Sequence, residues 1–152
     1  MTAPTYWTNG PTHITWTPVF DALEGDARVE LPLLGTVSAG APLDLAEERE
    51  SVIVPRQMAR KRRFALRVRG HSMVEDQIHD GDIIIVEQRQ TAENGETVVA
   101  LIKGEQVTLK RFYREHEAIR LQPANPTMEP LSVHHSEVQI LGVVSGLVRT
   151  SG

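Results

Sequence analysis

Residues 97–113 read TVVALIKGEQVTLKRFY, and this stretch predicts a β-hairpin. Its first part, 97–102, is a run of β-branched and apolar residues, which is typical of a buried strand. The loop Lys103-Gly104-Glu105 connects it to a second strand over 106–113. Side chains of a strand alternate between its two faces, so the apolar neighbours of Lys110 predict that this lysine is partly buried.

Strand signals continue on both sides of this hairpin. Turns are indicated by Asp80-Gly81-Asp82 and Asn94-Gly95, and a long loop by the prolines between 123 and 130. Further strands are predicted over 63–69, 83–86, 118–122, 138–144 and 147–149, with short helical turns over 55–61 and after Ser72. The sequence therefore predicts a mostly β fold, a compact antiparallel domain of six or more strands with short helical turns.

The composition limits the functional classes. The chain has 152 residues, a net charge of −4 and no cysteine. The length predicts one domain, and the acidic balance disfavours a strongly basic nucleic-acid binder. The absence of cysteine excludes a disulfide scaffold, a cysteine-ligated zinc site and a thiol nucleophile. No apolar run approaches the ~18 residues of a membrane span and no secretory signal is visible, so we expect a cytoplasmic protein without a membrane partner.

Residues 1–30 differ in composition from the rest. Residues 1–20 contain six threonines, three prolines and four of the seven aromatic residues, without a helical or alternating period. We interpret 1–30 as an irregular N-terminal arm and linker, and 31–150 as the domain. The arm is either a disordered leader or a segment that packs on the domain or a partner through Trp7, Trp16 and Phe20. Residues 1–30 hold one basic and four acidic residues, a charge of −3, which disfavours contact with DNA.

Two residues are candidates for catalysis. Ser72 lies in Gly70-His-Ser-Met73, directly after a predicted strand, where the glycine permits a sharp bend that exposes the hydroxyl and nearby backbone N–H groups. Burial of Lys110 disfavours its ammonium form and lowers its pKa, so that it can accept a proton from a serine hydroxyl. A loop serine and a solvated lysine on an edge strand are the alternatives.

Other polar groups suggest weaker sites. Two groups contain metal-ligating side chains without a convincing third or fourth ligand at a known spacing: His79 with Asp80 and Asp82, and His134 with His135 and Glu137. His71 adjoins Ser72, but neighbouring side chains of an extended chain point to opposite faces. Residues 56–69 hold seven basic residues and no acid, which indicates a solvated face or, alternatively, a patch for an acidic partner. We expect no metal and no cofactor.

Five segments, in order along the chain, resemble one known family. They are 33–40 (LLGTVSAG), 67–73 (RVRGHSM), 78–82 (IHDGD), 94–101 (NGETVVAL) and 107–111 (VTLKR). Together they resemble the C-terminal self-cleaving domain of LexA repressors and the related UmuD proteins, and 138–144 (VQILGVV) is similar to that family's last strands. The likeness covers about residues 31–150.

The resemblance implies a fold of the LexA/signal-peptidase type and a Ser/Lys dyad that cuts its own chain. Ser72 matches the nucleophile, Lys110 the general base and Ala39-Gly40 the scissile bond, while the backbone N–H groups of Ser72 and Met73 are candidates for the oxyanion hole. Further implications are a homodimer built on an exposed edge of the strands 138–144 and 147–149, stimulation by RecA filaments on single-stranded DNA, and an arm released by cleavage.

The sequence departs from that family in two places. Ser72 and Lys110 are 38 positions apart, one more than the resemblance implies, and we assign the extra residue to the loop 103–106 because a shifted register would turn Lys110 away. LexA repressors begin with a helix-turn-helix domain, which 1–30 is too short to hold, so this chain alone is not expected to bind DNA.

The leading hypothesis is therefore an SOS-response regulator of the LexA/UmuD type. The alternatives are a UmuD-like accessory of a translesion DNA polymerase and a non-catalytic LexA-like dimerisation module. Signal peptidase also pairs serine with lysine, but it needs a membrane anchor, and none is visible in the sequence.

Overall fold

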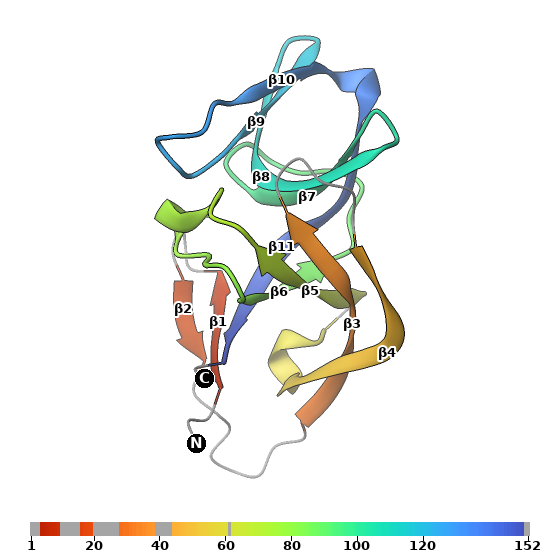
Figure 1. Ribbon diagram of the computed structural model, residues 1–152, viewed down its shortest axis with the longest axis vertical. Coiled ribbons are helices and arrows are strands. Elements are labelled where there is room, and N and C mark those ends of the chain that lie inside the picture. Colours follow the sequence, from red (N-terminus) through yellow and green to blue (C-terminus); the bar gives the residue numbers. More distant parts are fainter. Residues whose placement is uncertain (1–3, 10–15, 20–27, 39–43, 61, 151–152) are drawn as a thin grey trace.

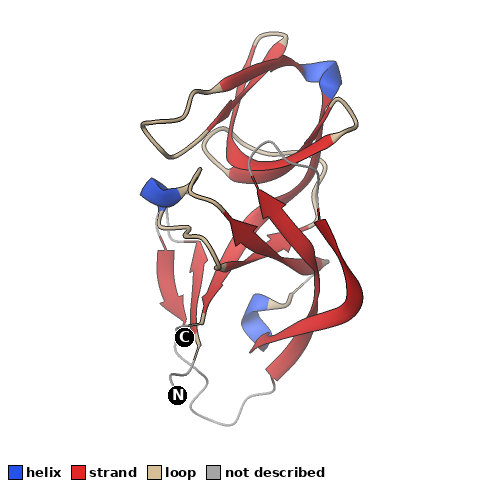
Figure 2. Ribbon diagram, viewed as in Figure 1, coloured by secondary structure: helices blue, strands red, loops and turns tan. Residues whose placement is uncertain are grey.

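One long strand, β11 (Val138–Arg149), runs through the molecule and joins its two halves (Figure 1). The computed structural model describes residues 4–9, 16–19, 28–38, 44–60 and 62–150, with the backbone alone for 44–49. Most of these residues lie in strands, and the helices are short (Figure 2). The other strands are β1 (Thr5–Asn9), β2 (Trp16–Val19), β3 (Arg28–Ser38), β4 (Asp44–Pro55), β5 (Arg63–Arg69), β6 (Ile83–Glu87), β7 (Thr97–Ile102), β8 (Gln106–Glu115), β9 (Ala118–Gln122) and β10 (Leu131–His134). The 3-10 turns are η1 (Arg56–Met58), η2 (Val74–Asp76) and η3 (His135–Glu137).

The strands form one hydrogen-bonded sheet in the order β10-β9-β8-β7-β11-β6-β5-β3-β4, with β1 paired to β11 and β2 paired to β1. The pairs of described strands are antiparallel except for β3 and β5, which run parallel. The predicted mostly β, mainly antiparallel fold is thus confirmed. No helix in the described ranges is long and apolar enough to span a membrane.

The strand β11 bends without ending. Its first half pairs with β7 and its second half with β6, and the register shifts at two bulges. A Cβ atom at Gly142 would lie 2.4 Å from Val86 Cγ1 and 2.7 Å from the carbonyl oxygen of Glu87, so the close approach at the first bulge needs glycine. The two strands expected over 138–144 and 147–149 are therefore one strand.

The position of β11 also corrects the expected dimer edge. Residues 143–148 pair with β6, and residues 146–149 pair with β1 as well. The expectation of an exposed edge is wrong for 143 and 146–148, because strands pair with both sides of β11 there. Residues 138–143 pair with β7, and the homodimer remains a proposal.

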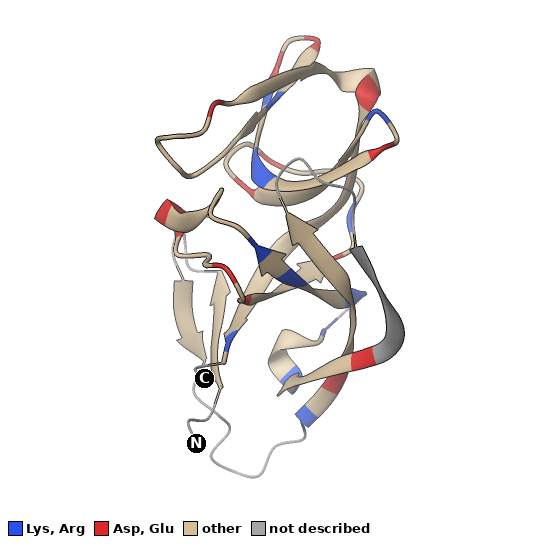
Figure 3. Ribbon diagram, viewed as in Figure 1, with Lys and Arg blue, Asp and Glu red and all other residues tan. Residues whose placement is uncertain are grey.

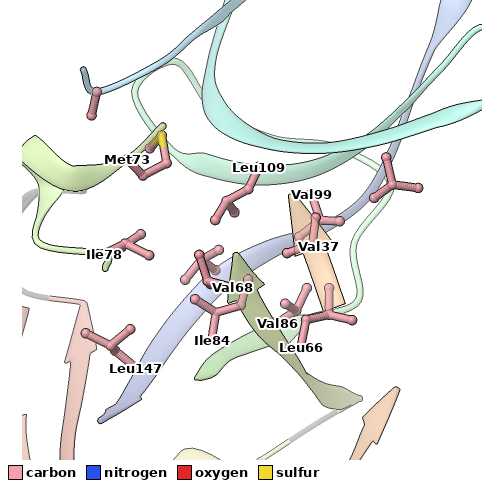
Figure 4. Packing of buried hydrophobic residues seen from close by; sticks show 13 residues of the cluster. Val37, Leu66, Val68, Met73, Ile78, Ile84, Val86, Val99, Leu109 and Leu147 are labelled. Carbon is pink, nitrogen blue, oxygen red and sulfur yellow. The ribbon is translucent and has the colours of Figure 1, made fainter. Parts of the chain in front are cut away.

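The core connects the strands that matter for the candidate site. One cluster of buried side chains, here called the central cluster, lies between β3, β5, β6, β8 and the chain after Ser72 (Figure 4). It includes Val37 from β3, Leu66 from β5 and Leu109 from β8, together with Met73 from the chain after Ser72. Full burial of such a side chain stabilises the fold by roughly 1.5–3 kcal/mol, so this cluster fixes these elements relative to one another.

Most of the predicted strands are confirmed. β5, β7 and β9 have the bounds that the sequence indicates, and β8 continues two residues beyond Tyr113. The hairpin turns at Lys103 and Gly104, both with positive φ. The loop expected over 123–130 is followed by a short strand, β10, which the sequence does not predict and which pairs with β9. Its sequence is too short and too polar to signal a strand without that neighbour.

The N-terminal arm is not irregular where the structure describes it. Thr5–Asn9 and Trp16–Val19 are strands, because pairing with β11 supplies backbone hydrogen bonds that the local sequence does not signal. Tyr6 is buried in a second apolar cluster, and both tryptophans pack against the central cluster. The described arm therefore packs on its own domain rather than forming a disordered leader. Phe20 lies outside the described residues.

Candidate active site

Ser72 lies on a tight loop at the end of β5. Gly70 bends the chain there with φ +96°, and its N–H donates to Asp80 Oδ1 over 2.7 Å. The carbonyl oxygen of Ser72 accepts a hydrogen bond from the N–H of Ala124 over 2.7 Å. Ser72 is 8% exposed, so the loop holds a nearly buried serine.

The turn after Ser72 leaves backbone N–H groups available. Asp76 N and Ile78 N donate to the carbonyl oxygen of Met73, which closes the turn η2. The N–H groups of Ser72 and Met73 donate to no described residue. Free N–H groups beside a serine hydroxyl are what an oxyanion hole requires.

Lys110 lies on β8 and is 9% exposed. Burial lowers the pKa of its amine from 10.5 to about 8. Its Nζ donates a hydrogen bond to Thr108 Oγ1 over 2.7 Å. The two side chains are two residues apart, so they share one face of β8. With this pKa, about one lysine in eleven is neutral at pH 7.

Lys110 lines a cavity of about 410 Å³ together with Leu121, Pro123, Met128 and Leu131. Its walls are mostly apolar. Gln106, Thr108 and Glu129 also line it, whereas Ser72 is not among its lining residues. The register of β8 against β7 is regular from Thr97 to Ile102, so the extra residue between the serine and the lysine does not shift this pairing.

The segment 123–124 connects the two candidates. Pro123 lines the cavity of Lys110, and the N–H of its neighbour Ala124 holds the carbonyl oxygen of Ser72. Ala124 and Met73 also belong to the same buried cluster as Leu109, which precedes Lys110 (Figure 4). The Ser72 loop and β8 thus share the central cluster through Met73 and Leu109, whereas Lys110 follows Leu109 and points to the other face of β8. In this conformation the amine of Lys110 is bonded to Thr108 rather than to Ser72.

The strand β3 leads the chain toward the same region. β3 and β5 are parallel, with Val37 beside Val68 and Ser38 beside Arg69. The two strands therefore end side by side. β5 ends three residues before Ser72, and β3 ends directly before Ala39. Val37 packs in the central cluster with Leu109 of β8. Ala39 and Gly40 themselves lie outside the described residues.

An ion pair beside the two candidates was not predicted. Arg111 Nε donates to Asp76 Oδ2 over 2.8 Å, and a second guanidinium nitrogen donates to Asp76 Oδ1. The hydrogen bonds that Arg111 donates to Asp76 raise the pKa of Arg111, so its guanidinium stays charged. Asp76 lies four residues after Ser72, and Arg111 directly follows Lys110. No local pattern signals the pair, because its members are 35 positions apart.

The other candidate groups have structural roles. The carboxylate of Asp82 accepts from the N–H of His79 and pairs with Arg149 at 2.8 and 2.9 Å. The rings of His134 and His135 stack with centroids 4.4 Å apart. Within the described ranges, no three histidine and acidic side chains gather in the arrangement of a metal site.

The basic run over 56–69 is largely a solvated face. Arg67 and Arg69 are exposed on β5, which carries basic residues in Figure 3, whereas Arg63 pairs with Glu87 at 3.4 Å. Arg56, Arg60 and Arg62 are also exposed. Lys61 lies outside the described residues.

Comparison with known proteins shows the family of the chain. Residues 32–145 match the family model described as Peptidase S24-like. A LexA repressor of Syntrophobacter fumaroxidans is 48% identical over 122 residues, which cover 80% of this chain and 59% of that protein. A LexA repressor of Myxococcus xanthus is 47% identical over 137 residues (84% and 61%), and one of Clostridioides difficile is 44% identical over 124 residues (80% and 58%).

The chain spans about three fifths of the length of these relatives. The match to the family model includes β5, β8 and the loop that carries Ser72. It also includes the end of β3. The chain belongs to the Peptidase S24-like family, with a domain of the LexA type.

Proposed function

We propose that this chain is an SOS-response regulator of the LexA/UmuD type that cleaves its own Ala39-Gly40 bond. Ser72 is the nucleophile and Lys110 the general base. The observation that carries the proposal is the buried lysine, whose lowered pKa suits a base and whose cavity is connected to the Ser72 loop through Pro123 and Ala124. Residues 31–150 are the self-cleavage and dimerisation domain.

The chemistry follows from the groups present. Neutral Lys110 takes the hydroxyl proton of Ser72 while Oγ attacks the carbonyl carbon of Ala39. The N–H groups of Ser72 and Met73 stabilise the negative charge on the carbonyl oxygen. The ammonium of Lys110 then returns the proton to the amide nitrogen of Gly40, and the peptide bond breaks to leave an ester on Ser72. Water hydrolyses this ester, with Lys110 again accepting the proton.

The substrate belongs to the same chain, which makes the reaction effectively unimolecular. The parallel pair β3–β5 supports this proposal, because Ser38 lies beside Arg69, three residues before Ser72. A tethered peptide has a high effective concentration, so no external substrate is required. Control then lies in the docking of the segment, and an activating partner acts by favouring the docked state.

The partners follow from the resemblance to LexA repressors. We propose that a RecA filament on single-stranded DNA stimulates cleavage, that the chain forms a homodimer and that it acts in the cytoplasm. DNA binding by this chain alone is not expected. A UmuD-like accessory of a translesion polymerase is the second candidate, on the same resemblance. A non-catalytic dimerisation module is the third.

The test is incubation of the purified chain at alkaline pH, with and without RecA filaments, followed by mass spectrometry. Cleavage after Ala39 in the wild type and none in Ser72→Ala is the expected result. If both proteins remain intact at every pH and with RecA, self-cleavage is refuted and the non-catalytic module is favoured. Co-purification of the cleaved form with a translesion polymerase favours the accessory role.

A further inference from the structure

The N-terminal hairpin of β1 and β2 contacts the loop that carries Ser72. β1 pairs with β11 through Thr5–Thr8, and β2 pairs only with β1 among the described strands. Asn9 Nδ2 donates to the carbonyl oxygen of Val144 over 2.8 Å and fixes the end of β1. The hairpin thus lies as an additional pair of strands beside the domain (Figure 1).

The outer strand of the hairpin reaches the Ser72 loop through one side chain. Trp16 Nε1 donates to the carbonyl oxygen of Asp76 over 2.8 Å. The indole is partly buried against the central cluster, to which Met73 and Ile78 of the same loop belong. The contact joins the first residue of β2 to the last residue of η2, four positions after Ser72.

Asp76 extends this contact to β8. Its carboxylate is 5% exposed and holds Arg111, the residue after Lys110, through two hydrogen bonds. The main chain of Asp76 is therefore held by the hairpin and its side chain by β8. One residue connects the arm, the serine loop and the lysine strand.

A second contact holds the far end of the same loop. The guanidinium of Arg149 lies 5.2 Å from the ring centroid of Trp7. It also donates to Gln77 O over 3.0 Å and to both carboxylate oxygens of Asp82. The hairpin thus borders the loop at two places, directly at Asp76 and through Arg149 at Gln77 and Asp82.

We infer that the N-terminal hairpin is a positioning element for the Ser72 loop and that Trp16 is the residue through which it acts. The inference rests on the proposed self-cleavage. Removing the indole N–H leaves the carbonyl oxygen of Asp76 without this donor and loosens η2, which sets the position of Ser72. It does not touch the hydrogen bond of Lys110 to Thr108 on β8.

The test compares Trp16→Phe with Tyr6→Phe. The first variant keeps an aromatic ring and loses the donor to the Ser72 loop. The second loses a hydroxyl of the same hairpin that donates to Ile53 O, on the side of β4. Loss of one hydrogen bond corresponds to about a three- to tenfold change in rate. Trp16→Phe is expected to lower the rate of self-cleavage by this factor without moving the midpoint of its pH profile, and Tyr6→Phe to leave the rate unchanged.

Hydrogen exchange gives a readout that does not depend on cleavage. In a Ser72→Ala background, Trp16→Phe is expected to speed amide exchange in residues 74–78 by a similar factor, and Tyr6→Phe to leave it unchanged. All measurements are made at least 15 °C below the lowest melting temperature. Unchanged amide exchange in Trp16→Phe refutes the claim that the hydrogen bond from Trp16 to Asp76 stabilises residues 74–78. Faster exchange with an unchanged cleavage rate refutes its role in positioning Ser72.

The two proposals fail in different ways. If the wild type does not cleave, the proposed function is refuted, and with it the role of Trp16 in the reaction. If the wild type cleaves and Trp16→Phe cleaves equally fast, only the present inference is refuted. A shifted pH midpoint in Trp16→Phe also contradicts it, since the change would then act on Lys110.

Discussion

The pH dependence of self-cleavage tests the role of Lys110 quantitatively. With a pKa of about 8, Lys110 is neutral in about 9% of molecules at pH 7 and about 91% at pH 9. A rate proportional to the neutral fraction therefore rises about tenfold between these values and then becomes constant. An exposed lysine with the ordinary pKa of about 10.4 would give a rise of nearly a hundredfold over the same range, still increasing at pH 9.

The assay follows the loss of intact chain by mass spectrometry from pH 6 to pH 11, in buffers of equal ionic strength. The reaction should be first order and independent of protein concentration, since the substrate is part of the same molecule. Ser72→Ala sets the background at each pH. A rate that climbs steadily to pH 10.5 without levelling refutes the lowered pKa. Equal cleavage in the serine variant refutes the dyad.

Three further predictions concern the fold. Lys110→Met should raise the melting temperature at pH 7. The pKa of the lysine is 10.5 in the unfolded chain and about 8 in the folded chain, so its burial lowers the free energy of unfolding at pH 7 by about 3 kcal/mol. The gain in melting temperature should shrink as the pH rises from 8 to 10.5, and an equal gain at pH 7 and pH 11 would contradict the prediction. Gly142→Ala should lower the melting temperature more than Gly104→Ala, since a Cβ collides with backbone and Val86 at the first position, whereas at the second it meets nothing within 4 Å and adds only the strain of a positive φ. After cleavage, fragment 1–39 should stay bound to the rest of the domain, because four of its side chains are buried and together contribute roughly 6–12 kcal/mol (Tyr6, Leu31, Leu33 and Val37). Co-elution of the two fragments and unchanged tryptophan emission are the expected results. Separation of the fragments in size-exclusion chromatography would refute the prediction.

The last of these predictions differs from the expectation that the sequence alone suggests. The resemblance implies an arm that cleavage releases. The structure pairs β1 with β11 and places β3 between β4 and β5. Cutting after Ala39 breaks none of these pairings, so the hairpin has no structural reason to leave.

The sequence predicts the strands whose own residues favour them. The apolar runs over 97–102 and 83–86 need no distant information, since a β-branched run between turn signals is buried wherever it lies. The arm is different, because Pro18 and the threonines carry no period. Pro18 lies in β2, which pairs with no described strand except β1, so its missing N–H costs no ladder bond to a further described strand. Residues 5–9 form the strand β1 because they pair with β11.

In the candidate site, too, some features can be predicted from local sequence and others depend on distant contacts. Ser72 and Lys110 are predicted from a glycine bend, an alternating strand and a resemblance. The Asp76–Arg111 pair and the contact of Trp16 with Asp76 join positions 35 and 60 apart, and nothing local marks them. Such contacts depend on how the arm and η2 pack on the domain, which is decided by the whole sheet.

The pKa of Lys110 limits how an activator can work. At pH 7 about one lysine in eleven is already neutral, so a partner that only deprotonated it would speed cleavage by at most about tenfold. Any larger stimulation by a RecA filament must come from docking of the segment after Ser38, which is a shift of population between undocked and docked states. The two routes differ in their pH dependence. Stimulation through docking should be equally large at pH 7 and pH 9, whereas stimulation through the lysine should nearly vanish at pH 9, where most of the lysine is neutral without help.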